Sequence, residues 1–179
     1  MTLRNASLIA LVGLPGSGKT TIGRQLAHSL GLEFLDTDHV IEQRLGCSVL
    51  SYFEREGEAE FRLLESAVLG ELCGLPSVVL ATGGGAVLKA ENRESLRRAD
   101  RVIYLHASPE NLFRRLRHDR TRPLLQVDDP MQRLKTLYHD RDPLYREVAH
   151  EVLDTGRMPI SALVGALVGP NPPGIAGLR

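Results

Sequence analysis

The chain has 179 residues, enough for one domain with its own hydrophobic core. Its 22 basic and 22 acidic residues give a formal net charge of +0, which argues against a protein that binds nucleic acid or an anionic membrane through its overall charge. Cys47 and Cys73 are its only cysteines, so the dense disulfide framework of a small secreted domain is excluded and a reduced, cytoplasmic setting is expected.

The chain begins with an apolar strand and a glycine-rich loop. Residues 7–13 (SLIALVG) predict a buried parallel strand, and the loop GLPGSGKTT spans residues 13–21. After the loop, Ile22, Leu26 and Leu30 recur at helical spacing, and Gly31 supplies a helix stop. Only 12 residues precede the loop, so we expect no targeting segment before it.

The loop matches the pattern G-x-x-x-x-G-K-[ST] through Gly13, Gly18, Lys19 and Thr20, between a strand and a helix as the pattern requires. Its backbone N–H groups can converge on an anion, and the helix N-terminus adds partial positive charge. Lys19 is expected to reach the outer phosphates of a nucleotide, and the Thr20 hydroxyl to bind Mg²⁺. Kinases, GTPases and motors share this loop. The sequence lacks both the Asn-Lys-x-Asp motif of GTPases and the Leu-Ser-Gly-Gly-Gln signature of transport ATPases, so a small kinase is favoured.

Two carboxylates end the second predicted strand, residues 32–38 (LEFLDTD). Asp36 and Asp38 are two residues apart, so in extended backbone their side chains lie on the same side. One carboxylate could hold a metal-bound water while the other orients an attacking hydroxyl or takes its proton. The structural alternative is that Asp38 caps a helix that begins near His39.

A long helix is predicted next. Its apolar stripe consists of Leu50, Phe53, Gly57, Phe61, Leu64 and Val68, and it ends near residues 74–76 (GLP). Arg62 and Glu65 lie three residues apart on this helix, close enough to pair. A solvated surface ion pair is the alternative to a functional role for these two residues.

The third predicted strand, residues 77–85 (SVVLATGGG), runs into three glycines. Gly83, Gly84 and Gly85 offer backbone N–H groups with no side chains to obstruct a ligand. The alternative is a tight turn that needs glycine for a positive φ.

The fourth predicted strand is residues 101–107 (RVIYLHA), and Pro109 then opens a helix at its first turn. Residues 113–130 (FRRLRHDRTRPLLQVDDP) carry five arginines: Arg114, Arg115, Arg117, Arg120 and Arg122. Arginines leading into a non-helical stretch suit a lid that closes over phosphates and excludes water. Some of them are expected to form only a solvated helix face.

The C-terminal third completes the α/β pattern. Arg141 precedes Asp142-Pro143, where we expect a helix interruption from which Arg141 either projects or is merely exposed. Residues 151–155 (EVLDT) predict a fifth strand, and the last helix carries Ile160, Leu163, Val164, Leu167 and Val168. Strands that alternate with helices predict a parallel sheet covered on both faces, with ligands at the carboxyl ends of its strands. We expect one domain over residues 1–169, a disordered tail over 170–179 and no membrane-spanning segment.

Taken in order, the motifs GLPGSGKTT, DTD, GEAEFRLLE, TGGG, RPLL and RDPLY resemble those of the shikimate kinase family, from Ile9 to about Val168. The resemblance implies a P-loop kinase fold, with a five-stranded parallel sheet of order 2-3-1-4-5 flanked by helices. It also implies a substrate-binding region at about residues 37–65 and a mobile lid at about residues 116–128. The implied reaction is the Mg²⁺-dependent transfer of the γ-phosphoryl group of ATP to the 3-hydroxyl of shikimate, by a monomer in aromatic amino-acid biosynthesis.

The resemblance also implies roles on the nucleotide side. The phosphates would be held by Gly16, Ser17, Gly18, Lys19, Thr20 and Thr21. Mg²⁺ would be bound by Thr20 and, through water, by Asp36. Arg122 would be the lid arginine that reaches the transferring phosphate, and Arg117 and the loop around Arg157 would flank the adenine.

On the acceptor side, the resemblance makes Asp38 the base or orienting group for the hydroxyl of shikimate. Arg62 and Arg141 would clamp its carboxylate, aided by the glycines at residues 83–85. This agrees with the chemistry of the residues themselves, because a hydroxylated carboxylic acid needs cations for its carboxylate and a carboxylate for its hydroxyl.

Two rival functions stay open at this point. One is a kinase for another small hydroxy acid, such as gluconate. The other is a sensor module that binds nucleotide or acid without turnover; such a module is expected beside a DNA-binding segment, for which this sequence leaves no room. The cysteines and the six histidines match no zinc-ligand spacing, so no zinc site is expected.

Overall fold

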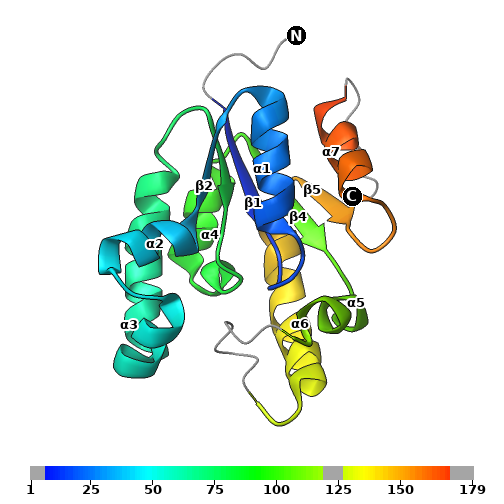
Figure 1. Ribbon diagram of the computed structural model, residues 1–179. Helices are drawn as coiled ribbons and strands as arrows, with labels where there is room; N and C mark the ends of the chain where they lie inside the picture. The colour runs from blue at the N-terminus through cyan, green and yellow to red at the C-terminus, as the bar shows by residue number, and fades with distance from the viewer. Residues whose placement is uncertain (1–6, 119–126, 170–179) are drawn as a thin grey trace.

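The five predicted strands form one parallel sheet in the computed structural model, which describes residues 7–118 and 127–169 (Figure 1). The strands are β1 (Leu8–Val12), β2 (Glu33–Asp36), β3 (Val78–Ala81), β4 (Arg101–His106) and β5 (Glu151–Asp154). Their order is β2-β3-β1-β4-β5, as the resemblance implied, with Ala10 of β1 in register with Leu80 on one side and Val102 on the other. The expected tail, most of the expected lid, and Arg120 and Arg122 within that lid lie outside the described residues.

Helices cover both faces of the sheet (Figure 1). One face packs against α1 (Lys19–Leu30) and α7 (Ile160–Val168). The other packs against α2 (Thr37–Leu45), α3 (Val49–Leu72), the short helix η1 (Ala86–Leu88), α4 (Ala90–Arg97), α5 (Pro109–Leu116) and α6 (Pro130–Val148). No helix in the described part of the chain is long and apolar enough to cross a membrane.

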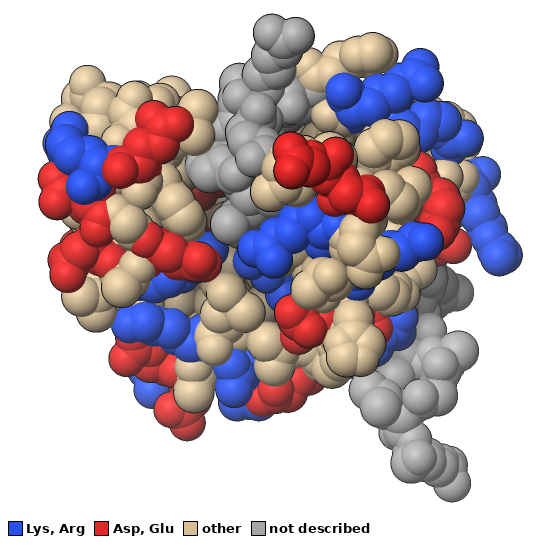
Figure 2. All heavy atoms as spheres, turned by 90° about the horizontal axis from the view of Figure 1, so that it is seen from below, with Lys and Arg blue, Asp and Glu red and all other residues tan. Residues whose placement is uncertain are grey.

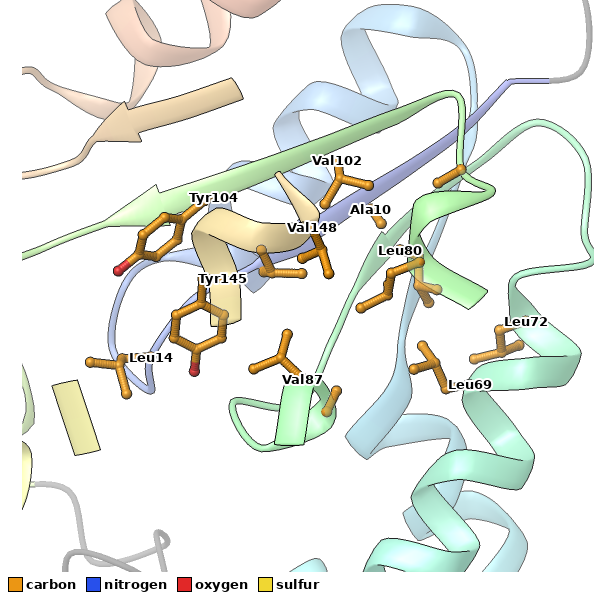
Figure 3. Packing of buried hydrophobic residues seen from close by; sticks show 14 of the residues in the cluster. Ala10, Leu14, Leu69, Leu72, Leu80, Val87, Val102, Tyr104, Tyr145 and Val148 are labelled. Atoms are coloured by element: carbon orange, nitrogen blue, oxygen red, sulfur yellow. The ribbon is translucent and has the colours of Figure 1, made fainter. Parts of the chain in front are cut away.

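The strands are apolar at most positions because helices cover both faces of the sheet. Successive side chains of a strand point to opposite faces, so Ala10 and Val12 join one core and Ile9 and Leu11 the other. Figure 3 shows the larger core, where Ala10 lies among side chains from neighbouring strands, from α3 and from α6.

The second strand is shorter than predicted. It ends at Asp36, and Asp38 already lies in the first turn of α2, so the premise that both aspartates belong to one extended strand is wrong. The alternative that Asp38 caps the helix is wrong too. Asp36 is the N-cap, because its backbone is still extended and its Oδ1 accepts hydrogen bonds from the N–H groups of Asp38 (3.0 Å) and His39 (3.4 Å).

The helix interruption expected at Pro143 does not occur, because α6 runs unbroken from Pro130 to Val148. Proline removes one N–H group, so the carbonyl of His139 loses its helical partner. His139 is exposed, where water can bind that carbonyl. The turns on either side keep Arg141 and Tyr145 buried, and this packing outweighs the single lost bond.

The long helix α3 is interrupted inside its predicted stripe. Gly57 has φ 85° and ψ 172°, a conformation outside the helical region that glycine adopts readily, and helical geometry resumes after it. The buried side of the following segment includes Phe61 and Val68, as the stripe predicted, but also the charged residues Arg62 and Glu65.

Gly13 joins β1 to the glycine-rich loop in a conformation that side chains rarely adopt. Its φ is +149°, and a Cβ added there would lie 2.7 Å from the carbonyl oxygen of Leu105 on the adjacent strand. We expect Gly13→Ala to lower the free energy of unfolding by about 2–3 kcal/mol, measured by urea denaturation.

Gly70→Ala is the matched control, because Gly70 is helical and a Cβ there meets nothing within 4 Å. It should raise the free energy of unfolding by about 0.5–1 kcal/mol. Equal effects of the two variants would show that the close approach at Gly13 does not constrain the fold.

Candidate active site

The loop between β1 and α1 has the features of a phosphate-binding site. Gly16 and Gly18 have φ values of 81° and 99°, which only glycine adopts readily. Gly18 is the N-cap of α1 and provides no side-chain cap, so the first N–H groups of the helix are available to an anion. The Lys19 ammonium donates to the carbonyl oxygens of Gly13 (2.7 Å) and Leu14 (3.0 Å), which holds a positive charge over the loop.

Ser17 differs from its neighbours in the loop. Its side chain faces Gly13, and its Oγ is buried with no hydrogen-bond partner among the described residues. Its backbone N–H donates to the carbonyl oxygen of Leu14 at 3.1 Å, a bond that closes the turn of the loop.

Thr20 and Asp36 form an oxygen pair beside the loop. The Thr20 hydroxyl donates to Asp36 Oδ2 at 2.8 Å, while the other oxygen of Asp36 caps α2. A hydroxyl and a carboxylate are ligands that suit Mg²⁺, which keeps several waters and completes its shell with phosphate oxygens. Accordingly, the described residues contain no cluster of three or more His, Cys, Asp or Glu side chains that could hold a metal alone.

A cleft of about 1000 Å³ connects the loop with the ends of β2 and β3. Its lining includes the loop residues Gly16 to Thr21, together with Asp36, Asp38 and Gly84. Arg115, Met158 and Pro159 line it on the side of β5. Figure 2 views the molecule from below, from the side on which the strands end, and shows Lys and Arg side chains interspersed with Asp and Glu rather than a surface of one charge.

Arg62 and Glu65 form a buried ion pair, so the surface alternative is wrong. The Nη1–Oε2 distance is 2.6 Å, and the two residues are 8% and 0% exposed. Burial raises the pKa of Glu65, an effect that the charge of Arg62 opposes. Glu58, at the exposed rim, accepts two further hydrogen bonds from Arg62 at 3.1 and 3.3 Å. Removing either buried partner would leave an uncompensated charge.

The glycines after β3 allow the closest contacts in this region. A Cβ on Gly85 would lie 2.3 Å from the guanidinium of Arg62, and one on Gly83 would lie 2.5 Å from Glu65 Oε1 and 3.0 Å from Asp38 Oδ1. The segment does form a tight turn, in which the N–H of Ala86 donates to the carbonyl of Gly83 at 3.1 Å, but none of the three glycines has the positive φ that this alternative invoked. Glycine is needed here because charged side chains pack directly against the backbone.

Arg141, on α6, is the second arginine of this region and is only 3% exposed. Burial lowers its pKa, and the nearby charge of Arg62 adds to the effect. Its guanidinium lies close to the hydroxyl of Tyr145, which partly offsets the effect of burial, and that hydroxyl donates to the carbonyl of Gly84. The predicted acceptor residues from α3, α6 and the glycine segment therefore meet at the carboxyl edge of the sheet.

Arg115 is a cleft residue that the sequence did not distinguish from the four other arginines of residues 113–130. It donates to the carbonyl of Gly16 (3.1 Å) and to Thr155, through the side-chain oxygen (3.1 Å) and the carbonyl (2.7 Å). Arg117 and Arg157 are exposed and do not line the cleft, and Arg157 pairs with Asp154 at 3.4 Å. Ser108 and Pro109 mark the start of α5, and Leu112 and Leu116 form its buried face. Arg115 immediately precedes Leu116 and so lies beside that face. This helical spacing is a sequence signal that could have separated Arg115 from Arg117.

Three comparisons agree on the family. The sequence pattern of the shikimate kinase family matches residues 15–168. The chain is similar to a shikimate kinase from Paracidovorax citrulli, with 58% identity over 151 residues that cover 83% of this chain and 82% of the relative.

Among solved structures, the chain is similar to a shikimate kinase from Acinetobacter baumannii in complex with shikimate, with a TM-score of 0.88, 48% identity and coverage of 90% of each chain. The chain also resembles a gluconokinase from Sinorhizobium meliloti, with a TM-score of 0.53 and an alignment that covers 89% of this chain and 87% of the gluconokinase chain. The sequence identity is only 20%, so this similarity shows a shared fold and nothing more. With the P-loop kinase fold, the phosphate loop and the buried arginines in place, the chain belongs to the shikimate kinase family.

Proposed function

We propose that the chain transfers the γ-phosphoryl group of ATP to the 3-hydroxyl of shikimate in the presence of Mg²⁺. The observation that carries the proposal is that Asp38 and Gly84 line the cleft of the phosphate loop, while the buried Arg62 packs against Gly85 and the buried Arg141 lies beside Tyr145, which binds Gly84. Such an edge offers an anion site for the donor phosphates and a second site for a small acid that carries a hydroxyl. The relative from Acinetobacter baumannii, whose structure contains shikimate, supports this choice of acceptor.

The nucleotide phosphates would bind the backbone N–H groups of residues 16–21, at the N-terminus of α1. Lys19 would leave the carbonyls of Gly13 and Leu14 and donate to the transferring phosphate, where negative charge develops. Thr20 and Asp36 would hold Mg²⁺, whose charge neutralises the phosphate oxygens. The proposed lid arginine, Arg122, lies outside the described residues.

The acceptor would bind across the glycine segment from the phosphate loop. Arg62 and Arg141 would share its carboxylate, because each guanidinium presents several donors to a planar anion. No ion pair between Arg141 and a carboxylate is found among residues 7–118 and 127–169, and only the more distant charges of Glu58 and Glu65 act on it, so an incoming carboxylate would supply a direct ion-pair partner. Asp38, whose Oδ1 lies beside Gly83, would accept the hydrogen bond of the reacting hydroxyl and orient it.

Catalysis at this site would come mainly from positioning and charge stabilisation. The acceptor clamp fixes the hydroxyl relative to the donor phosphate, while Lys19 balances the charge of the transition state. Asp38 takes the proton of the hydroxyl as the new O–P bond forms and the bond to the leaving ADP oxygen breaks. Excluding water from the cleft would favour transfer to the acceptor over hydrolysis.

We also propose that Arg115, rather than Arg117, contacts the nucleotide. Arg115 lines the cleft and bridges the phosphate loop to the segment after β5, where Met158 and Pro159 form the facing wall. Arg117, the C-cap residue of α5, does not line the cleft. The same chain supplies every residue of the proposed site and has both cysteines as free thiols, which fits the further proposal of a cytoplasmic monomer.

An acceptor panel tests the proposed reaction. ADP formation by the purified protein should depend on shikimate and should not occur with gluconate. Lys19→Ala should lower turnover by about 100-fold or more, because it removes a charge from the transferring phosphate. Lys135→Ala, an exposed lysine on α6, is the control and should leave turnover unchanged. Turnover with gluconate alone, or tight binding of shikimate without turnover, would contradict the proposal.

Steady-state kinetics of arginine variants test the acceptor clamp. Arg62→Ala and Arg141→Ala should each raise the KM for shikimate by about 10- to 100-fold and leave the KM for ATP nearly unchanged. Arg146→Ala changes an exposed arginine of the same helix as Arg141 and should affect neither constant. An equal rise of both KM values in the buried variants would mean that these arginines act only through the fold.

The two helix-end arginines can be compared directly. Arg115→Ala should raise the KM for ATP by about 10-fold, since it loses its link to the phosphate loop, while Arg117→Ala should have little effect. The opposite order would restore Arg117 as the nucleotide contact.

A further inference from the structure

The proposed acceptor site is assembled from segments far apart in the chain. Gly84 follows β3, and Arg141 lies on α6, 57 residues later. The side chain of Tyr145, one helical turn after Arg141, lies between them: its hydroxyl donates to the carbonyl oxygen of Gly84 and lies close to the guanidinium of Arg141. This is the described contact through which the glycine segment and the α6 arginine can hold each other in place.

The tyrosine itself is fixed by packing. Tyr145 is 0% exposed, and its ring lies 5.0 Å from that of Tyr104 on β4, at an interplanar angle of 32°. Figure 3 shows the two rings side by side, with Leu14 of the phosphate loop nearby. Because the ring is held by packing, its hydroxyl has a defined position. That position in turn restricts where the Gly84 carbonyl and the Arg141 guanidinium can lie.

The direction of each hydrogen bond is also fixed. Burial raises the pKa of Tyr145, so the hydroxyl keeps its proton throughout the neutral range. A neutral hydroxyl has one donor, which Gly84 uses, so the hydroxyl can offer only its lone pairs to the neighbouring guanidinium of Arg141. Arg141 can therefore interact favourably with this hydroxyl only by directing an N–H group at it, which constrains where its remaining donors point.

Arg141 needs such a constraint more than an exposed arginine would. It is buried, it lies close to the like charge of Arg62, and no ion pair with a carboxylate holds it within the described part of the chain. Arg62, in contrast, is held by Glu58 and Glu65. Without Tyr145, repulsion from Arg62 would favour orientations of Arg141 that turn away from it and from a shared carboxylate.

We propose that Tyr145 is a positioning residue for the acceptor, whose hydroxyl aligns Arg141 and the Gly84 backbone for a carboxylate that both buried arginines bind. The inference rests on the proposed function, because it assumes that the acceptor carboxylate binds there. It assigns Tyr145 no contact with the reacting atoms and no effect on the nucleotide. Its effect is therefore on the affinity for the acceptor.

Tyr145→Phe removes the hydroxyl and keeps the ring. It should raise the KM for shikimate by about 10-fold, the cost of losing a hydrogen bond to a charged group, with little change in kcat or in the KM for ATP. Tyr104→Phe is the matched control, since it removes the hydroxyl of the neighbouring ring, which donates to Asp142 at 2.8 Å. It should leave both KM values unchanged.

A double variant separates positioning from packing. If Tyr145 acts through Arg141, Tyr145→Phe should add much less to the KM for shikimate in an Arg141→Ala background than in the wild type. Urea denaturation of each variant shows how much of the effect is lost stability. Unchanged KM values in Tyr145→Phe, equal effects in both tyrosine variants, or full additivity with Arg141→Ala would each overturn the proposal. Wild-type turnover of shikimate keeps the proposed function intact in those cases, and its absence would overturn both.

Discussion

Two buried arginines of like charge, Arg62 and Arg141, constrain the architecture of the proposed acceptor site. A guanidinium taken out of water must be compensated nearby, and two of them close together repel each other. The chain meets this requirement in two ways. Glu65, fully buried on the same helix, neutralises Arg62, and the Tyr145 hydroxyl binds Arg141 without adding charge. Among the described residues Arg141 thus has no direct ion pair, which would leave its guanidinium available to an acidic substrate.

The parallel sheet explains why this charge lies beside a phosphate loop. β1 and β3 are neighbours, so the loop after β1 and the glycines after β3 emerge at the same edge. Gly85 lets the guanidinium of Arg62 pack against the backbone, and Gly83 admits the carboxylates of Glu65 and Asp38. The donor and acceptor sites are therefore built on one rigid edge, which fits a reaction that depends on positioning.

Features set by local geometry could be predicted from the sequence, whereas those set by burial could not. The five strands follow from apolar runs, and that prediction is confirmed. The glycine-rich loop lies between β1 and α1 as predicted, and its binding of phosphates stays a prediction. The roles of Asp36 and Asp38 were harder to assign because the strand ends two residues earlier than predicted. Asp36 is therefore the N-cap of α2, and Asp38 lies in the first turn of that helix instead of in the strand. Pro143 was misjudged because the packing of Arg141 and Tyr145 outweighs one lost hydrogen bond. Arg62 and Glu65 are buried against Gly85 and Gly83 of the segment after β3, a contact between distant parts of the chain that the residue spacing does not indicate.

The central claim is that both buried arginines bind one carboxylate while Asp38 binds the hydroxyl to be phosphorylated. A crystal structure of this protein with shikimate and ADP tests it most directly. The account predicts the shikimate carboxylate within hydrogen-bonding distance of both guanidinium groups, with the 3-hydroxyl against Asp38 and facing the phosphate loop. A carboxylate bound away from Arg62 and Arg141, or a 3-hydroxyl turned away from Asp38, would contradict it.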